Sequence, residues 1–286
     1  MRIISVFVFA LGVLSGPAAA QISCGQFDFA TPFAEAFANA KPYADAHRAA
    51  QTITTLSDGA CHQDRLLKIF AERYGAVVGY KAAATSPGAQ KQLGLSEPVL
   101  GVLFADMLHH DGATVPIANG ARLIYELDLL ARVADPALID ATTREEALAG
   151  IDALIPFIEL GDLMVPKGAA VTGPLLQAMN AGTRAGIVGS PVPVDGLSEE
   201  DIGALSGVLA ADGTVVAKAD GTALLGHPLD AVLWIAEAAR ARGFTLKAGD
   251  VLSLGSLGPF QFASAGVVKA RYDIGGTPAE VTVTLE

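Results

Sequence analysis

Residues 125–133 read YELDLLARV, which predicts an apolar strand that contains two acids. Successive side chains of a strand point to opposite faces, so Glu126 and Asp128 share one face and the intervening leucines share the other. Two like charges side by side repel each other unless a cation joins them or water surrounds that face. The pair therefore indicates a cation site or a solvated strand face, and the spacing alone does not separate the two.

A third acid, Glu159, lies alone in the apolar segment 155–160, IPFIEL. A buried carboxylate without a partner is costly, so it normally shifts its pKa or finds a cation. Three carboxylates converging on one point would form an all-oxygen site for a hard divalent cation, with positions left for substrate and water. Their convergence is not visible in the sequence.

On both sides of residues 125–133, short runs that are rich in β-branched residues or that alternate between apolar and polar residues lie between Gly, Pro and Asp turns. The predicted strands are residues 77–82, 113–117, 125–133, 214–217, 267–272 and 279–285. The predicted helices lie within residues 27–75, at 142–154 with Thr143 as a cap, and at 229–242 with Gly243 as the stop. Residues 190–200 read as a polar loop. Strands and helices without regular alternation predict an α+β fold with a mixed sheet or roll.

The charge balance restricts the partners. A net charge of −11 and a pI near 4.8 argue against binding to nucleic acid or to an anionic membrane surface. An anionic small-molecule substrate would therefore need a local cation, from a metal or a placed lysine.

The N-terminus predicts export. Arg2 precedes an apolar run at residues 3–14, and Ala18-Ala19-Ala20 gives the small-x-small pattern that signal peptidase accepts. The run is too short for a permanent transmembrane helix, although a retained anchor is the alternative. We therefore expect residues 1–20 to be a signal peptide, and the protein to be periplasmic or secreted, without membrane association after cleavage.

Two cysteines, Cys24 and Cys61, fit that expectation. In an exported chain two thiols are most simply a disulfide, here one that ties the N-terminal tail to a helix beginning near Cys61. Two unpaired buried thiols are the alternative.

Several motifs together resemble the 2-keto-4-pentenoate hydratase branch of the fumarylacetoacetate hydrolase superfamily. They are Gly79-Tyr80-Lys81, Thr85-Ser86, Gln92-Leu93-Gly94, 101–107 (GVLFADM), 225–232 (LGHPLDAV), 246–250 (LKAGD) and 255–259 (GSLGP). The resemblance covers about residues 75–275. It implies a mixed β-roll core flanked by helices, with residues 21–75 as a helical segment packed on a catalytic domain at 76–286. Homo-oligomerisation is a further implication of the family.

The resemblance also implies the site. The family's metal-binding acids fall on Glu126, Asp128 and Glu159, which implies Mg²⁺ or Mn²⁺. Gly255, Ser256 and Leu257 match the loop near the substrate carboxylate. The usual hydratase has glutamate where this chain has Asp128, so the metal would shift or take a water in place of a direct bond.

Two residues match the family's catalytic positions. Lys81 would place positive charge near the substrate 2-oxygen or move the proton, since a partly desolvated lysine has a lowered pKa. The alternative, a surface lysine, fits poorly with the apolar strand VVGYKAAA. Asp106 matches an acid on the loop that approaches the substrate, although an Asp at that position also caps turns.

These features predict a divalent-metal-dependent hydro-lyase that adds water to a small 2-hydroxy-dienoic or 2-keto-enoic acid. The same enolate stabilisation would serve decarboxylation of a 2-oxo acid or hydrolysis of an acylpyruvate, which are the alternatives within the superfamily. An exported binding protein that has kept the fold and lost turnover is the alternative from another class.

Overall fold

The computed structural model of the protein describes residues 24–286, so the predicted signal peptide, residues 1–20, lies outside the described residues. The α-helices are α1 (Ala30–Ala38), α2 (Ala46–Thr52), α3 (Leu56–Tyr74), α4 (Pro87–Leu93), α5 (Arg144–Ala149), α6 (Gly173–Ala178), α7 (Glu199–Gly203) and α8 (Pro228–Ala241). Short 3₁₀ turns are η1 (Ala105–Met107), η2 (Ile117–Asn119), η3 (Pro136–Asp140), η4 (Asn180–Gly182) and η5 (Gly221–Ala223). None of the helices in this range combines the length and apolar character needed to cross a bilayer.

The strands of the described chain form two sheets. The order in the larger sheet is β2 (Val99–Phe104), β1 (Val77–Ala83), β11 (Val251–Ser253), β5 (Leu123–Val133), β6 (Ile151–Asp162), β7 (Thr183–Val188) and β3 (Leu108–His110). Two short strands extend it, β12 (Gln261–Phe262) beside β5 and β8 (Val192–Pro193) beside β6. The order in the smaller sheet is β10 (Thr214–Asp220), β9 (Ser206–Ala211), β13 (Gly266–Ile274), β14 (Thr277–Leu285) and β4 (Thr114–Val115).

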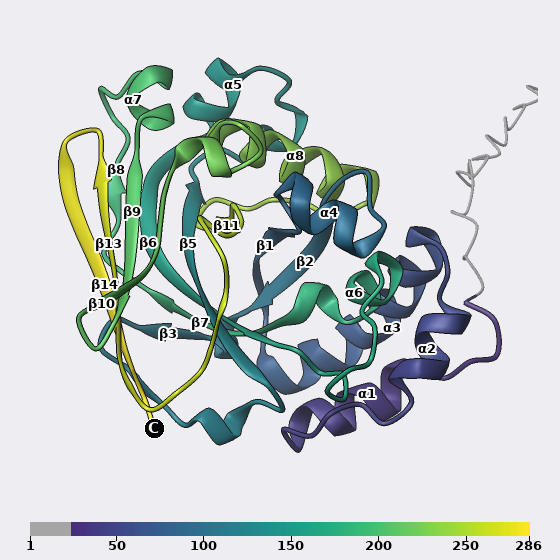
Figure 1. The fold of residues 1–286 in the computed structure, drawn as a ribbon. Coiled ribbons are helices and arrows are strands. Elements are labelled where there is room, and N and C mark those ends of the chain that lie inside the picture. Colours follow the sequence, from purple (N-terminus) through teal and green to yellow (C-terminus); the bar gives the residue numbers. More distant parts are fainter. Residues whose placement is uncertain (1–23) are drawn as a thin grey trace, which may run out of the picture.

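The larger sheet is mixed, because β1 runs parallel to β11 and β3 parallel to β7 while β5 and β6 are antiparallel. The smaller sheet packs against β5 and β6, and helices α1, α2 and α3 lie together on the other side of the molecule (Figure 1). The predicted α+β fold, a mixed β-roll flanked by helices, is confirmed. The division of the chain at residue 75 stays a prediction.

The N-terminal helices are held by aromatic packing and by a covalent bond. Thr55 and Asp58 form a capping box that starts α3, and further along this helix the Phe70 ring meets the Phe104 ring of β2 with centroids 6.1 Å apart. The predicted disulfide is confirmed, since Cys24 is bonded to Cys61 with Cα atoms 5.5 Å apart. The bond closes a loop over a sequence separation of 37 residues and fixes the tail to α3.

Several elements differ from the sequence prediction, among them β2, β7 and β9, which it did not include. The helix predicted at 142–154 begins at the Thr143 cap as expected but ends at Ala149, because residues 151–162 form β6. Nearly every residue of β6 is buried on both faces, so the strand lacks the alternation by which strands are recognised. The strand predicted at 113–117 shortens to β4, and the polar loop at 190–200 contains β8 and the start of α7.

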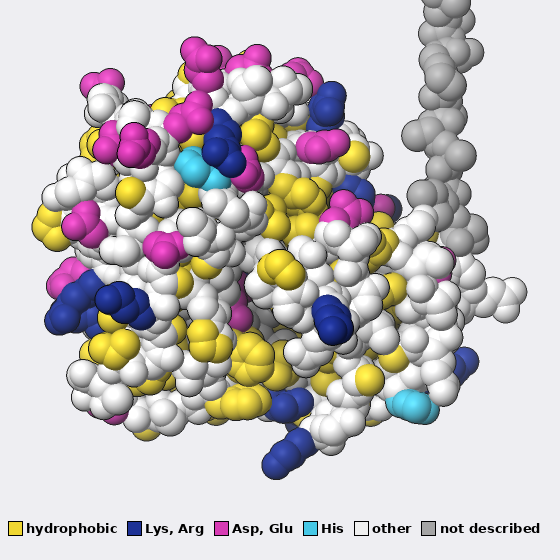
Figure 2. All heavy atoms as spheres, turned by 45° about the horizontal axis from the view of Figure 1, so that its top comes forward, with side chains coloured by type: hydrophobic (Ala, Val, Ile, Leu, Met, Phe, Trp, Pro, Cys, Tyr) yellow, Lys and Arg dark blue, Asp and Glu magenta, His cyan; other side chains and the backbone are white. Residues whose placement is uncertain are grey.

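Acidic side chains gather on the face that carries α5 and α7 (Figure 2). The first turn of α7 alone contributes Glu199, Glu200 and Asp201, where negative charge interacts favourably with the helix dipole. These surface acids contribute to the negative charge of the chain. They are separate from the buried acids of β5 and β6.

Candidate active site

The predicted acids meet on the paired strands β5 and β6. Glu126 lies directly opposite Glu159 in the antiparallel register, and Asp128 lies two residues along β5 on the same face. Glu159 and Asp128 are buried, with 4% and 0% exposure, whereas Glu126 is partly exposed. The predicted shared face of Glu126 and Asp128 agrees with the register, which also places Glu159 on that face.

Lys81 reaches this face from β1, where it is 3% exposed. Its Nζ forms an ion pair with Glu159 Oε1. On the other side, Lys81 is level with Gly101 of β2, and a Cβ on that glycine would lie 2.6 Å from Lys81 Cγ. Lys81 is thus an interior residue held in place by a carboxylate and by the backbone of β2, and it is not a surface lysine.

The close packing of these charges shifts several pKa values. Burial raises the pKa of Glu126 to about 8, and the nearby Glu159 carboxylate adds to the rise. Burial raises the pKa of Asp128 to about 7 in the same way. Burial by itself lowers the pKa of Lys81, but the charges of Glu159, Glu126 and Asp128 outweigh it, so the net direction is upward. The lowered lysine pKa expected from the sequence is therefore wrong for the protein without a bound cation, because the carboxylates could not be counted as partners in advance.

The oxygens of Asp128 are already engaged by donors. Ser253 Oγ donates to Oδ2 at 2.6 Å, while the Gly255 and Leu129 amides donate to Oδ1 at 3.1 and 2.5 Å. Tyr272 of β13 donates its hydroxyl to the Asp128 backbone carbonyl and, at 3.0 Å, to that of Phe157. Ser253 and Tyr272 were not predicted; a serine within the apolar run VLSL is the signal by which Ser253 could have been found.

The loop Gly255–Leu257 runs over this face of β5. The Leu257 amide donates to the Leu127 carbonyl at 2.7 Å, and Ser256 Oγ donates to the Gly258 carbonyl at 2.7 Å. Gly255 has a φ of 107°, and a Cβ there would lie 2.5 Å from Thr85 Cγ2, so only glycine fits. The structure brings this loop to the acids as expected, whereas its contact with a substrate stays a prediction.

Asp106 lies apart from this group. It is exposed in η1, and its Oδ2 would be 3.4 Å from a Cβ on Gly75, at the end of α3. The described contacts of Asp106 do not include Lys81 or the three acids, and its predicted catalytic role stays a prediction.

A recess of about 540 Å³ lies elsewhere, between α5, α7 and α8, and is lined by Arg144, Glu199 and His227. His227 is the N-cap of α8, where its Nδ1 accepts the Leu229 amide at 3.1 Å, and its Nε2 lies 3.0 Å from the Glu199 carbonyl. Both ring nitrogens are thus occupied by structural bonds, which makes this recess a weaker candidate than the acid and lysine cluster.

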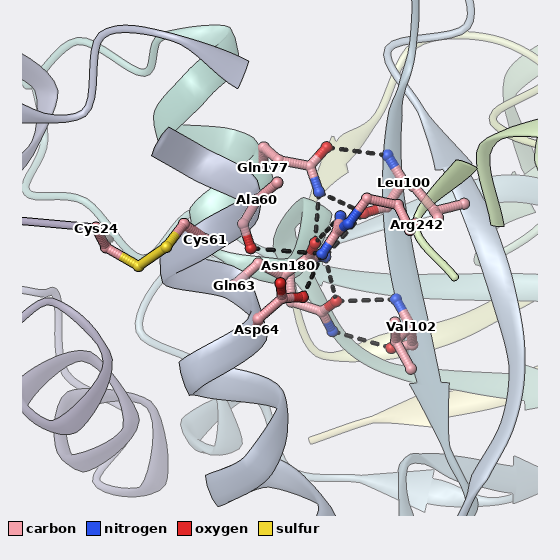
Figure 3. A network of polar contacts seen from close by, with 10 residues as sticks. All are labelled: Cys24, Ala60, Cys61, Gln63, Asp64, Leu100, Val102, Gln177, Asn180 and Arg242. Carbon is pink, nitrogen blue, oxygen red and sulfur yellow. Dashed lines mark hydrogen bonds and ion pairs between the residues drawn. A yellow bond between two sulfur atoms is a disulfide. The ribbon is translucent and has the colours of Figure 1, made fainter. Parts of the chain in front are cut away.

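A network of carboxamide side chains bonds to the backbone of β2 (Figure 3). Asn180 pairs with both the amide and the carbonyl of Val102, at 2.8 and 2.9 Å. Gln63 of α3 and Gln177 of α6 both donate to the Leu100 carbonyl at 2.8 Å, and Gln63 also contacts Asn180 at 3.0 Å. These bonds satisfy the outer edge of β2 at the two residues that flank Gly101.

The arrangement fits a hard divalent cation with two carboxylates. Among residues 24–286, no three His, Cys, Asp or Glu side chains are arranged as a ready ligand set. Glu126 and Glu159 lie directly opposite each other on the paired strands, and Mg²⁺ is commonly held by one or two carboxylates with the remaining positions left to water and substrate.

Comparison with known proteins gives the family. The family model for the fumarylacetoacetate (FAA) hydrolase C-terminal domain matches residues 73–280. A 2-keto-4-pentenoate hydratase of Burkholderia vietnamiensis is 35% identical over 207 residues, covering 69% of this chain and 74% of that protein. A 2-hydroxyhexa-2,4-dienoate hydratase of Comamonas testosteroni is 29% identical over 237 residues, covering 78% of this chain and 87% of that protein.

Among solved structures, 4-oxalocrotonate decarboxylase from Pseudomonas putida G7, complexed with magnesium and adipate, superposes with a TM-score of 0.78. It is 22% identical and covers 89% of this chain and 94% of that one. A fumarylpyruvate hydrolase from Pseudomonas aeruginosa, in complex with Mn²⁺ and pyruvate, superposes with a TM-score of 0.52, is 15% identical, and covers 72% of this chain and 88% of that one. At these identities the likeness shows the shared fold.

The predicted export is contradicted by these similarities. The curated relatives are named as 2-keto-4-pentenoate hydratases, and their match to this chain gives no support for export. A periplasmic or secreted location was inferred from Arg2, the apolar run and the alanine pattern within residues 1–20, together with two cysteines.

Proposed function

Because the chain belongs to the fumarylacetoacetate hydrolase family, and within it to the 2-keto-4-pentenoate hydratase branch, we propose that it is a hydro-lyase that adds water to a small 2-hydroxy-dienoic or 2-keto-enoic acid. The observation that carries this proposal is the buried ion pair of Lys81 and Glu159 directly opposite Glu126. Relatives named as hydratases are 28–35% identical, against 22% for the decarboxylase, which favours hydration over decarboxylation.

In this proposal Glu126 and Glu159 would hold Mg²⁺ or Mn²⁺, which supplies Lewis-acid stabilisation of negative charge on the substrate 2-oxygen. The neighbouring decarboxylase and hydrolase structures are complexed with magnesium, calcium or Mn²⁺, which supports a divalent cation without selecting one. The negative charge of the chain makes such a local cation necessary for an acidic substrate.

The residues of the chain then have separate tasks. Lys81 holds a proton at Nζ, because its pKa is raised, and would place positive charge beside the substrate 2-oxygen. The loop Gly255–Leu257 would lie against the substrate carboxylate, as the family resemblance implies. Burial of Lys81 and Glu159 excludes bulk water, which strengthens these charge interactions.

The test uses the purified protein with Mg²⁺ and 2-hydroxypenta-2,4-dienoate, following the dienol ultraviolet band and identifying the product by NMR. We expect conversion to 4-hydroxy-2-oxopentanoate that is abolished by EDTA and lost in Glu159→Gln. The matched control is Glu280→Gln, an exposed glutamate of β14 that pairs with Lys269, which should leave turnover unchanged. Turnover that persists in EDTA and in Glu159→Gln would refute the proposed site, and release of CO₂ would replace hydration by decarboxylation.

A further inference from the structure

Arg122 brings a positive charge to the face of β5 that carries the acids. It directly precedes the strand, and the alternation of side chains places it on the same face as Ile124 and Glu126. Its Nη1 donates a hydrogen bond to the Val165 carbonyl at 3.3 Å. In the described part of the chain no carboxylate forms an ion pair with its guanidinium. Arg122 therefore keeps donors for a partner that the protein itself does not provide.

The acid that holds the Arg122 backbone does not pair with its side chain. Asp162 accepts the Ala121 and Arg122 amides at 2.9 and 2.7 Å, and its ion pair, at 2.6 Å, is with Arg184. A guanidinium presents a planar fork of donors that matches a carboxylate. In a chain with a net charge of −11, an arginine without a counter-ion on the site face favours an anionic ligand at that point.

Two exposed phenylalanines lie beside the stretch of β5 from Arg122 to Glu126. They belong to the chain that runs from β11 past β5 to β13 (Figure 1). In this segment Phe262 pairs with Ile124, and continuing the register by one residue sets Phe260 level with Glu126. The two rings meet edge to face with centroids 5.7 Å apart, and the residues are 44% (Phe260) and 56% (Phe262) exposed. The Arg122 guanidinium carbon lies 5.6 Å from the centroid of the Phe262 ring. The pair thus forms an apolar wall between the cation of Arg122 and the acids.

The spacing along β5 fits a small molecule with an acidic group at each end. Arg122 and Glu126 are four residues apart, which is about 13 Å along a strand. A metal–oxygen contact of about 2 Å at one end and a guanidinium–carboxylate contact of about 3 Å at the other leave roughly 8 Å between them. Three bonds of an extended chain span about 3.8 Å, so a chain of six or seven carbons has nearly this length.

We propose that Arg122 binds a second carboxylate at the far end of the substrate, and that Phe260 and Phe262 line its carbon chain. The substrate class is then a 2-hydroxy-dienoic or 2-keto-enoic diacid of six or seven carbons. This inference rests on the proposed function and deepens it, because the acid cluster receives the 2-oxo acid head and Arg122 selects what lies at the other end. The hydratase relatives described above are named for acids with one carboxylate, so the second carboxylate would distinguish this chain from them.

The test compares two probes that differ at one end only. 2-Oxoadipate and 2-oxohexanoate share a six-carbon chain and the 2-oxo acid head, and neither has a double bond to hydrate. Each is titrated into the protein by calorimetry with Mg²⁺ present. We expect the wild type to bind 2-oxoadipate about 10- to 100-fold more tightly, because the second carboxylate gains charge-assisted hydrogen bonds from Arg122. General repulsion by an acidic protein would act in the opposite direction.

Three variants show whether Arg122 causes the preference. Arg122→Gln should abolish it by weakening 2-oxoadipate alone, and the backbone amide that bonds to Asp162 is unaffected by the substitution. Arg122→Lys keeps the charge without the fork, so it should retain part of the preference and provides a second route if Arg122→Gln does not fold. The matched control is Arg132→Gln, at the other end of β5, where the arginine is paired with Asp152; it should bind both probes as the wild type does.

The outcomes separate this inference from the proposed function. Equal wild-type affinity for the two probes, or a preference that persists in Arg122→Gln, would overturn the role of Arg122 and leave the proposed cation site standing. Failure of the wild type to bind either probe would refute the proposed site together with this inference. Hydration of 2-hydroxypenta-2,4-dienoate without any preference for the diacid probe would support the proposed function and refute only the second carboxylate.

Discussion

Replacing Gly101 by alanine tests whether the position of Lys81 limits the reaction. A Cβ at this residue would lie 2.6 Å from Lys81 Cγ and 2.9 Å from Ala181 Cβ, both closer than real Cβ contacts. Ala181 is fixed in a backbone turn beside Asn180, so the lysine is the group that must move. Gly101 is not among the described glycines with a positive φ. The substitution therefore acts through these contacts and not through backbone strain.

Gly101→Ala should change both stability and rate. The loss of stability comes from overpacking, and the loss of rate comes from misplacement of the Lys81 charge. Extra volume in a well-packed interior costs about 1–3 kcal/mol, which lowers Tm by roughly 2–10 °C for a chain of this size. A catalytic group displaced by about 1 Å can lose on the order of 10²-fold in rate. We therefore expect Gly101→Ala to fold with a lowered Tm and to lose about that factor in kcat.

Gly88→Ala in α4 is the matched control, because no heavy atom lies within 4 Å of the added Cβ and alanine favours a helix. Thermal unfolding and the dienol ultraviolet assay measure both variants. If Gly101→Ala loses stability but keeps the wild-type kcat, the position of Lys81 does not limit the reaction and this reasoning is refuted.

Three further predictions concern Lys81, the disulfide and the pKa of Glu126. Lys81→Met should lower kcat by about 10²–10⁴-fold while calorimetry still detects Mn²⁺ binding, and loss of binding would mean that the lysine organises the site instead of acting in the reaction. The double variant Cys24→Ser, Cys61→Ser should be roughly 2–4 kcal/mol less stable in denaturant titrations with kcat unchanged, because the disulfide restricts the unfolded chain; equal stability would contradict this. Burial raises the pKa of Glu126 from 4.5 to about 8, so the folded state holds a proton that the unfolded state releases, and the cation-free protein should lose stability as pH rises through that interval. Thermal unfolding in EDTA checks this, and an equally steep pH dependence in Glu126→Gln would contradict it.

The sequence predicts those parts of the fold whose signals are local. Thr143 caps α5 and Gly243 follows α8 as expected, because capping and stop residues act within one helical turn. The strand β6 is missed as a strand because it is buried on both faces, so its composition does not distinguish it from a buried helix.

Some features of the site could likewise be predicted from the sequence, and others could not. The shared face of Glu126 and Asp128 follows from strand alternation, and the match of Lys81 follows from the family resemblance. The partners of Asp128 do not follow, because Ser253 is 125 residues away in the sequence and only the pairing of β11 with β5 brings it there. The rise in the pKa of Lys81 likewise depends on charges from two other strands, which no local pattern encodes.

The carboxamide network on β2 has a consequence for how this protein can assemble. An outermost strand normally offers free amide and carbonyl groups that can recruit a strand from another chain. Here Leu100 and Val102 have already used theirs on Gln63, Gln177 and Asn180. A second copy could extend the sheet at this border only after breaking those bonds and leaving buried amides without partners, so the edge of β2 is closed to strand addition at these residues.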